Sequence, residues 1–136
     1  MSSFRKYMDR CQELATVASE QGESPVGAMV VKEGTIIAEA TEATRRNEDI
    51  TRHAEIEVIA KAADVLGKDL SGCTLITTHE PCVMCSYVIR FHGLSEVVYG
   101  QPSDYLGGIT SPFAVLTTDQ IPDHWSNPPK IYQLTK

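Results

Sequence analysis

The stretch Pro81-Cys82-Val83-Met84-Cys85, together with the earlier triplet His53-Ala54-Glu55, decides how this 136-residue chain is interpreted. Imidazole nitrogen and thiolate sulfur are good zinc ligands, and a catalytic zinc site keeps three protein ligands while its fourth position stays open to water. His53, Cys82 and Cys85 supply such a set. Two cysteines three positions apart at a helix start can reach one metal, because that end of a helix favours thiolates. Pro81 is typical of such a start.

Glu55 follows His53 by two residues, which is too close along a helix for both side chains to join one set of metal ligands easily. Its carboxylate is nevertheless placed to reach a water molecule held by the metal. We therefore expect Glu55 to carry protons rather than to act as a fourth ligand. Because zinc lowers the pKa of bound water from about 15.7 to about 7, the predicted chemistry is hydrolysis at neutral pH.

The pattern H-x-E followed by P-C-x-x-C is the signature of zinc deaminases. On these residues the chain resembles the cytidine deaminase superfamily. Within it, the chain is most similar to the branch of guanine deaminases, yeast-type cytosine deaminases and tRNA adenosine deaminases, where the second motif reads E-P-C-x-M-C, here residues 80–85. The similarity covers roughly residues 4 to 100 and includes Pro25-Val26-Gly27-Ala28, Cys73-Thr74-Leu75-Ile76-Thr77-Thr78 and Val97-Val98-Tyr99-Gly100. The resemblance implies Zn²⁺ as cofactor, held by His53, Cys82 and Cys85, with Glu55 as the catalytic residue.

Apolar periodicity and turn residues predict an α/β fold. We expect helices at residues 3–20, 52–66 and 81–91, and strands at 26–31, 35–40, 73–78, 94–100 and 130–134. The first two strands form a hairpin, and the strand, helix, strand connections favour parallel pairing with right-handed crossovers. The predicted architecture is a three-layer α/β/α sandwich with a central mixed sheet of about five strands, in a single domain of residues 1–136. Ligands bind at the carboxyl ends of strands in such sheets, and both motifs fall there.

The composition is that of an ordinary globular protein, with 42% hydrophobic and 22% charged residues. No apolar run follows the charged start or approaches membrane length, so we expect neither a signal peptide nor a membrane span, and a cytoplasmic location. Four cysteines without any mark of secretion favour metal chemistry over disulfides. A net charge of −6 argues against strong binding of nucleic acid, although a local basic patch near Arg45-Arg46 leaves such binding open.

The substrate is suggested by a departure from the family pattern. Similar purine and tRNA deaminases carry an Asn that touches the substrate eleven residues before the zinc His, whereas this chain has Glu42. An ionised Glu only accepts hydrogen bonds, so it prefers a substrate edge that presents N–H groups, as guanine, isocytosine and other 2-amino heterocycles do. We therefore expect hydrolytic deamination of a small aminated nucleobase or nucleoside, with guanine as the first candidate. Ala54, His79 and Pro81 are the other residues expected at the substrate pocket, where backbone amides near Ala54 and Cys82 steady the developing charge.

Other interpretations of the motifs stay open. Cytosine deamination and tRNA adenosine deamination are the nearest alternatives, and the resemblance also implies a homodimer. A non-catalytic zinc subunit is a second class, but the intact Glu55 argues against it, since structural sites close with a fourth protein ligand. A thiol redox pair at Cys82 and Cys85 is a third class, which leaves His53 and Glu55 without a role. Residues 101–129 are expected to form a long loop that either covers the site or is anchored to the core by its aromatic side chains.

Overall fold

The computed structural model describes residues 4–134 and has three helices and five strands within that range. In chain order these are α1 (Arg5–Glu20), β1 (Gly27–Lys32), β2 (Thr35–Thr41), α2 (Ala54–Leu66), β3 (Cys73–His79), α3 (Val83–His92), β4 (Glu96–Gln101) and β5 (Lys130–Gln133). The predicted order is confirmed, with boundaries that move by one or two residues, while the expected helix start at Ser3 lies outside the described residues. Within residues 4–134, no helix combines the length and the apolar character needed to cross a membrane.

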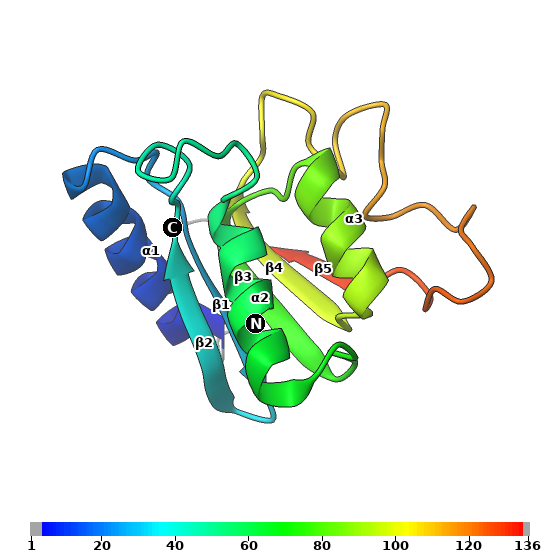
Figure 1. Ribbon diagram of the computed structural model, residues 1–136. Helices are drawn as coiled ribbons and strands as arrows, with labels where there is room; N and C mark the ends of the chain where they lie inside the picture. The colour runs from blue at the N-terminus through cyan, green and yellow to red at the C-terminus, as the bar shows by residue number, and fades with distance from the viewer. Residues whose placement is uncertain (1–3, 135–136) are drawn as a thin grey trace.

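The strands form one mixed sheet in the order β2-β1-β3-β4-β5 (Figure 1). β1 is antiparallel to both β2 and β3, whereas β3, β4 and β5 run parallel to one another. One detail differs from the prediction, and a second was not predicted. β2 and β3 are joined through α2 but do not pair, because β1 lies between them. β4 and β5 pair in parallel although no helix connects them.

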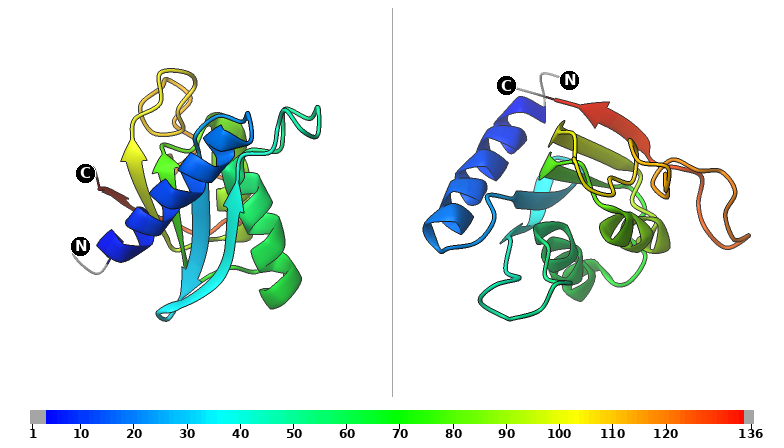
Figure 2. Two further views of the ribbon diagram at one scale, coloured as in Figure 1. Left: turned by 90° about the vertical axis from the view of Figure 1, so that its left-hand side faces the viewer. Right: turned by 90° about the horizontal axis from the view of Figure 1, so that it is seen from above.

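The three-layer α/β/α arrangement is confirmed: α1 covers one face of the sheet, and α2 and α3 cover the other (Figure 2). Alternation along β1 explains the two cores, since successive side chains of a strand point to opposite faces. Ala28 and Val30 pack with residues of α2 and α3, while Met29 and Val31 pack with residues of α1. A central strand with helices on both faces has to be apolar on both sides.

α1 approaches the sheet most closely at Gly27, the first residue of β1. A Cβ atom at this position would lie 2.6 Å from the Cβ of Leu14 and 2.8 Å from the backbone nitrogen of Ala15. Only glycine permits this close approach of helix and strand. The contact fixes the start of β1. Ser24 and Val26, just before this start, line the pocket that is described with the candidate active site.

Residues 102–129 form the long connection between β4 and β5, which lies next to α3 (Figure 1). The buried Arg90 of α3 holds its second half by donating hydrogen bonds to the carbonyl groups of Val115, Leu116, Thr118 and Ser126. The Arg90 guanidinium also lies 5.4 Å from the ring centroid of Trp125. Of the two roles expected for this loop, anchoring through an aromatic side chain is therefore found at Trp125.

Candidate active site

The three predicted metal ligands meet where α2 and α3 begin. His53 is the N-cap of α2, Cys82 is the N-cap of α3, and Cys85 lies in the first turn of α3. Nδ1 of His53 lies 3.5 Å from Sγ of Cys82 and 3.4 Å from Sγ of Cys85. The topology causes this convergence: β2 and β3 are both antiparallel to β1, so they end at the same edge of the sheet, and each leads into one of these helices.

This donor set fits zinc. Bond lengths of about 2.1 Å for Zn–N and about 2.3 Å for Zn–S place the nitrogen and sulfur ligands of a tetrahedral ion about 3.6 Å apart. The two distances from His53 match this value, and the three ligand atoms lie within 4.8 Å of one another. Among residues 4–134, no further His, Cys or carboxylate joins the group. Three protein ligands leave one position for water, which is typical of catalytic zinc sites.

The electrostatics of the ligands also suit a metal. Hydrogen bonds from the Cys85 side chain and from His53 lower the pKa of Cys82 to about 4, although burial opposes the shift. Cys82 is therefore a thiolate at neutral pH, the form that binds metals. The same hydrogen bond with Cys82 raises the pKa of His53 to about 9, again against burial. A metal ion that binds here must displace the proton of His53.

Glu55 lies in the first turn of α2 and is only 4% exposed. The hydroxyl of Thr77, near the end of β3, donates to its Oε2 at 2.8 Å, and its Oε1 lies 4.0 Å from Sγ of Cys85. Burial raises the pKa of the Glu55 carboxyl to about 7, while the Thr77 hydrogen bond lowers it. A carboxyl group with a pKa near the working pH can both take up and release a proton.

A pocket of about 260 Å³ lies beside these residues. It is lined by Ser24, Val26, Glu42, His53, Glu55, His79, Glu80, Cys82, Ser103 and Tyr105. Of the residues predicted to bind substrate, Glu42 and His79 line this pocket, whereas Ala54 and Pro81 are buried outside its lining. The backbone N–H of Ala54 donates to Glu42, and the carbonyl of Pro81 accepts a hydrogen bond from Gly108.

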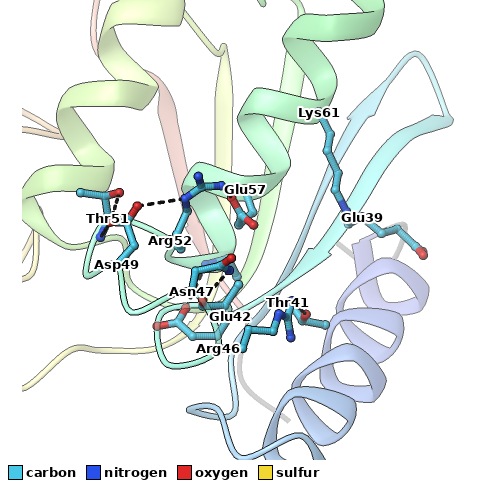
Figure 3. Close-up of polar contacts among 12 residues, drawn as sticks. Glu39, Thr41, Glu42, Arg46, Asn47, Asp49, Thr51, Arg52, Glu57 and Lys61 are labelled. Atoms are coloured by element: carbon cyan, nitrogen blue, oxygen red, sulfur yellow. Dashed lines mark hydrogen bonds and ion pairs between the residues drawn. The ribbon is translucent and has the colours of Figure 1, made fainter.

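Glu42 directly follows β2 and is 7% exposed, so it does not face bulk solvent. Its Oε1 accepts the Ala54 N–H at 2.9 Å, and no described residue donates to Oε2. Burial raises the pKa of the Glu42 carboxyl, and the hydrogen bond from Ala54 lowers it. Figure 3 shows Glu42 at the base of the loop before α2, where Asp49 accepts hydrogen bonds from Thr51 and Arg52. The loop thus holds a carboxylate oxygen available to a ligand in the pocket.

A family model described as the cytidine and deoxycytidylate deaminase zinc-binding region matches residues 1–101. The chain belongs to this deaminase family. It is therefore a zinc-dependent hydrolytic deaminase, and His53, Cys82 and Cys85 lie close enough together to hold its metal. The predicted family, enzyme class and cofactor are confirmed.

Individual proteins similar to this deaminase have different substrates in their names. A tRNA-specific adenosine deaminase of Aquifex aeolicus is 42% identical over 100 residues, which make up 73% of this chain and 66% of the relative. A solved structure from work on A-to-I editing by tRNA deaminases at the wobble position superposes with a TM-score of 0.84 and 32% identity, covering 96% of this chain and 98% of that one. A guanine deaminase from Bacillus subtilis gives a TM-score of 0.70 and 37% identity, covering 72% of this chain and 64% of that one.

Several residues at the site of this deaminase were not predicted from its sequence. Thr77 contacts Glu55, while Ser103 and Tyr105 reach the pocket from the connection between β4 and β5. The only signal for Thr77 was its place near the end of the strand that leads to the cysteine motif. Ser103 and Tyr105 lie in the segment 101–129, for which a place over the site was one of the two expected roles, but the segment lacks periodicity and no local pattern marks these two residues.

Proposed function

We propose that this deaminase acts on an adenosine within a tRNA, converting it to inosine with release of ammonia. The observation that carries the proposal is the similarity to the wobble-position tRNA deaminase structure, which covers nearly the whole length of both chains. Because it covers 96% of this chain, the similarity extends beyond residues 1–101, the part matched by the family model, into the connection that carries Ser103 and Tyr105. Recognition of the substrate depends on such segments more than on the metal ligands.

The residues at the site have distinct roles in this reaction. Zinc, when bound, supplies a strong oxygen nucleophile at neutral pH. Glu55 accepts a proton from the attacking water and donates it to the ring nitrogen next to the reacting carbon. It then takes the second proton from the hydroxyl group now attached to that carbon and delivers it to the departing amine. Thr77 holds one carboxylate oxygen of Glu55, so that the other oxygen stays directed towards the metal side of the pocket. A carbon–oxygen bond forms, the carbon–nitrogen bond breaks, and ammonia leaves.

An RNA substrate has to be reconciled with the net charge of −6. Because the overall charge repels phosphate groups, binding has to rest on local contacts near the pocket. Arg45 and Arg46 are exposed on the loop whose ends, Glu42 and His53, line the pocket. These two side chains are the basic groups that we expect to meet the RNA backbone.

Guanine deamination is a second candidate because of Glu42. Its carboxylate lines the pocket with one oxygen free of described donors, and an acceptor at this place suits the N–H groups of a 2-amino heterocycle. The similarity to the Bacillus subtilis guanine deaminase is in line with this candidate.

A substrate panel separates the two candidates. The zinc-loaded enzyme is given an RNA stem-loop with adenosine at the wobble position, free adenosine, guanine, cytosine and isocytosine, with Glu55→Ala as the blank. Inosine formation in the stem-loop, with no ammonia from guanine, supports the main proposal. Turnover of guanine or isocytosine that falls in Glu42→Asn, with an unreactive stem-loop, refutes it in favour of the second candidate.

The proposal also includes a homodimer in the cytoplasm. The outer face of α3 exposes Tyr87 and Phe91, which are 53% and 43% accessible, and such apolar side chains suit a subunit interface. Thiolate ligands have to stay reduced, as they do in the cytoplasm. Sedimentation equilibrium of the zinc-loaded protein tests the dimer, and a monomeric mass at micromolar concentration contradicts it.

A further inference from the structure

Glu80 is a buried carboxylate with a role that the zinc chemistry does not explain. It lies two residues before Cys82, is 3% exposed, and accepts hydrogen bonds from one segment far along the chain. Its Oε1 accepts the backbone N–H of Ser103 at 3.0 Å, and its Oε2 accepts those of Ile109 and Thr110 at 2.9 and 2.8 Å. The Thr110 hydroxyl donates as well, at 2.9 Å from Oε1. One side chain thus holds both ends of the segment formed by residues 102–110. We call this segment the 102–110 loop.

The backbone next to Glu80 fastens the same loop. The N–H of Val83 donates to the carbonyl of Leu106 at 2.9 Å, and the N–H of Gly108 donates to the carbonyl of Pro81 at 2.8 Å. Gly107 packs directly on the Glu80 carboxylate, and a Cβ atom there would collide with both of its oxygens. Glycine at this position is therefore required by the close approach. The loop is bound to the cysteine motif over its whole length.

The 102–110 loop forms one wall of the substrate pocket. Ser103 and Tyr105 line the pocket that also contains His53, Glu55 and Cys82. Inside the loop, the Ser103 hydroxyl accepts the N–H of Tyr105 at 3.1 Å and donates to its carbonyl at 3.0 Å. Because Glu80 binds the N–H of Ser103, its position determines where this turn, and hence the Tyr105 side chain, stands relative to the zinc ligands.

We propose that Glu80 is a positioning residue for substrate binding, which acts through the 102–110 loop by holding Ser103 and Tyr105 as a preformed wall of the pocket. A loop held by four hydrogen bonds to one buried carboxylate is not a lid that closes on the substrate. Because the wall is already ordered when the protein folds, the entropy cost of ordering it does not reduce the free energy of substrate binding. Loss of the Glu80 contacts should therefore weaken substrate binding and leave the chemical step in place.

Glu23 provides a matched control. It is also a buried carboxylate, 5% exposed, and it accepts the backbone N–H groups of Arg45 and Arg46, each at 2.9 Å. Neither Glu23 nor these two arginine residues line the pocket. Because these arginine residues are the basic groups proposed to meet the RNA, Glu23→Gln serves as a control for zinc content and for the dynamics of the 102–110 loop, and not for KM.

The experiment compares Glu80→Gln with Glu23→Gln. A Gln amide places an N–H group against at least one backbone donor, so Glu80→Gln releases Ser103 or the pair Ile109 and Thr110. Loss of a hydrogen bond to a charged group corresponds to about a tenfold effect. We expect KM for the wobble-adenosine stem-loop to rise about tenfold in Glu80→Gln, with kcat within about twofold of the wild type and zinc content unchanged. Glu23→Gln should keep its zinc as well.

Amide hydrogen exchange provides a readout that needs no substrate. The KM measurement rests on the proposed function, whereas exchange at residues 103–110 reports on the loop even if the RNA is not the substrate. Exchange there should accelerate in Glu80→Gln and not in Glu23→Gln. If Glu80→Gln does not fold, Thr110→Val takes its place, because it removes only the exposed hydroxyl donor, and KM should then rise about threefold. An unchanged KM, equally fast exchange at residues 103–110 in Glu23→Gln, or loss of zinc with loss of kcat would overturn the proposal.

Discussion

Replacing Thr77 by Val tests whether the orientation of Glu55 limits catalysis. Thr77 is fully buried in β3, and its hydroxyl donates to Oε2 of Glu55 at 2.8 Å. Valine has nearly the same shape and a high strand propensity, so the fold and the metal ligands should be kept. A hydrogen bond to a charged group contributes about 1.5–3 kcal/mol, and about 1.4 kcal/mol corresponds to a factor of ten. We expect kcat to fall by about 10- to 100-fold, measured by ammonia release at saturating substrate.

Thr74→Val is the matched control for this prediction. Thr74 lies on the same strand, is also buried, and donates to the carboxylate of Glu96 over the same distance of 2.8 Å. Glu96, however, starts β4 at the opposite edge of the sheet from the metal ligands. The two variants should lose similar amounts of thermal stability, but only Thr77→Val should lose turnover. A kcat within twofold of the wild type in Thr77→Val, or an equal loss in Thr74→Val, would refute the reasoning.

Three further predictions follow from the site and the fold. Glu55→Ala should keep its zinc by metal analysis but lose turnover by about 10²- to 10⁴-fold, because it removes the proton carrier; near-normal activity would exclude that role. Cys85→Ala should purify with less than stoichiometric zinc, and a chelator should lower the melting temperature of the wild type but not of this variant. Gly27→Ala should cost about 1–3 kcal/mol in the free energy of unfolding, since its methyl group meets α1; an unchanged denaturation midpoint would show that the helix shifts freely.

The metal ligands and Glu55 were predictable because their signal is local. Cys82 and Cys85 are close in sequence, and a helix start needs few residues to be recognised. The order of the strands was harder to predict. The apolar pattern of β1 suits a central strand in any position, and nothing in it specifies that β1 separates β2 from β3. Hydrogen bonding across the sheet selects that order, and such pairing leaves little trace in a single sequence.

The pocket wall could not be predicted for a related reason. Glu80 belongs to the cysteine motif, but its partners lie 23 to 30 residues further along a segment without periodicity. The burial of Glu42 could not be predicted either, because it stands in a polar stretch where a solvated side chain is the common outcome. The N-terminus of α2 changes that outcome, since the free N–H of Ala54 attracts the carboxylate into the pocket.

The placement of His53 and Cys82 at helix N-caps has a consequence for how this protein can change over evolutionary time. The chemistry occupies only the first turns of α2 and α3, so the later turns need only keep the apolar stripe that packs on the sheet and, in α3, Arg90, which anchors the connection between β4 and β5. The outer face of α2, where Val65 is 66% accessible, is free to acquire substitutions. New partners can therefore be recruited by mutations on this face, without disturbing the reaction that the helix starts perform.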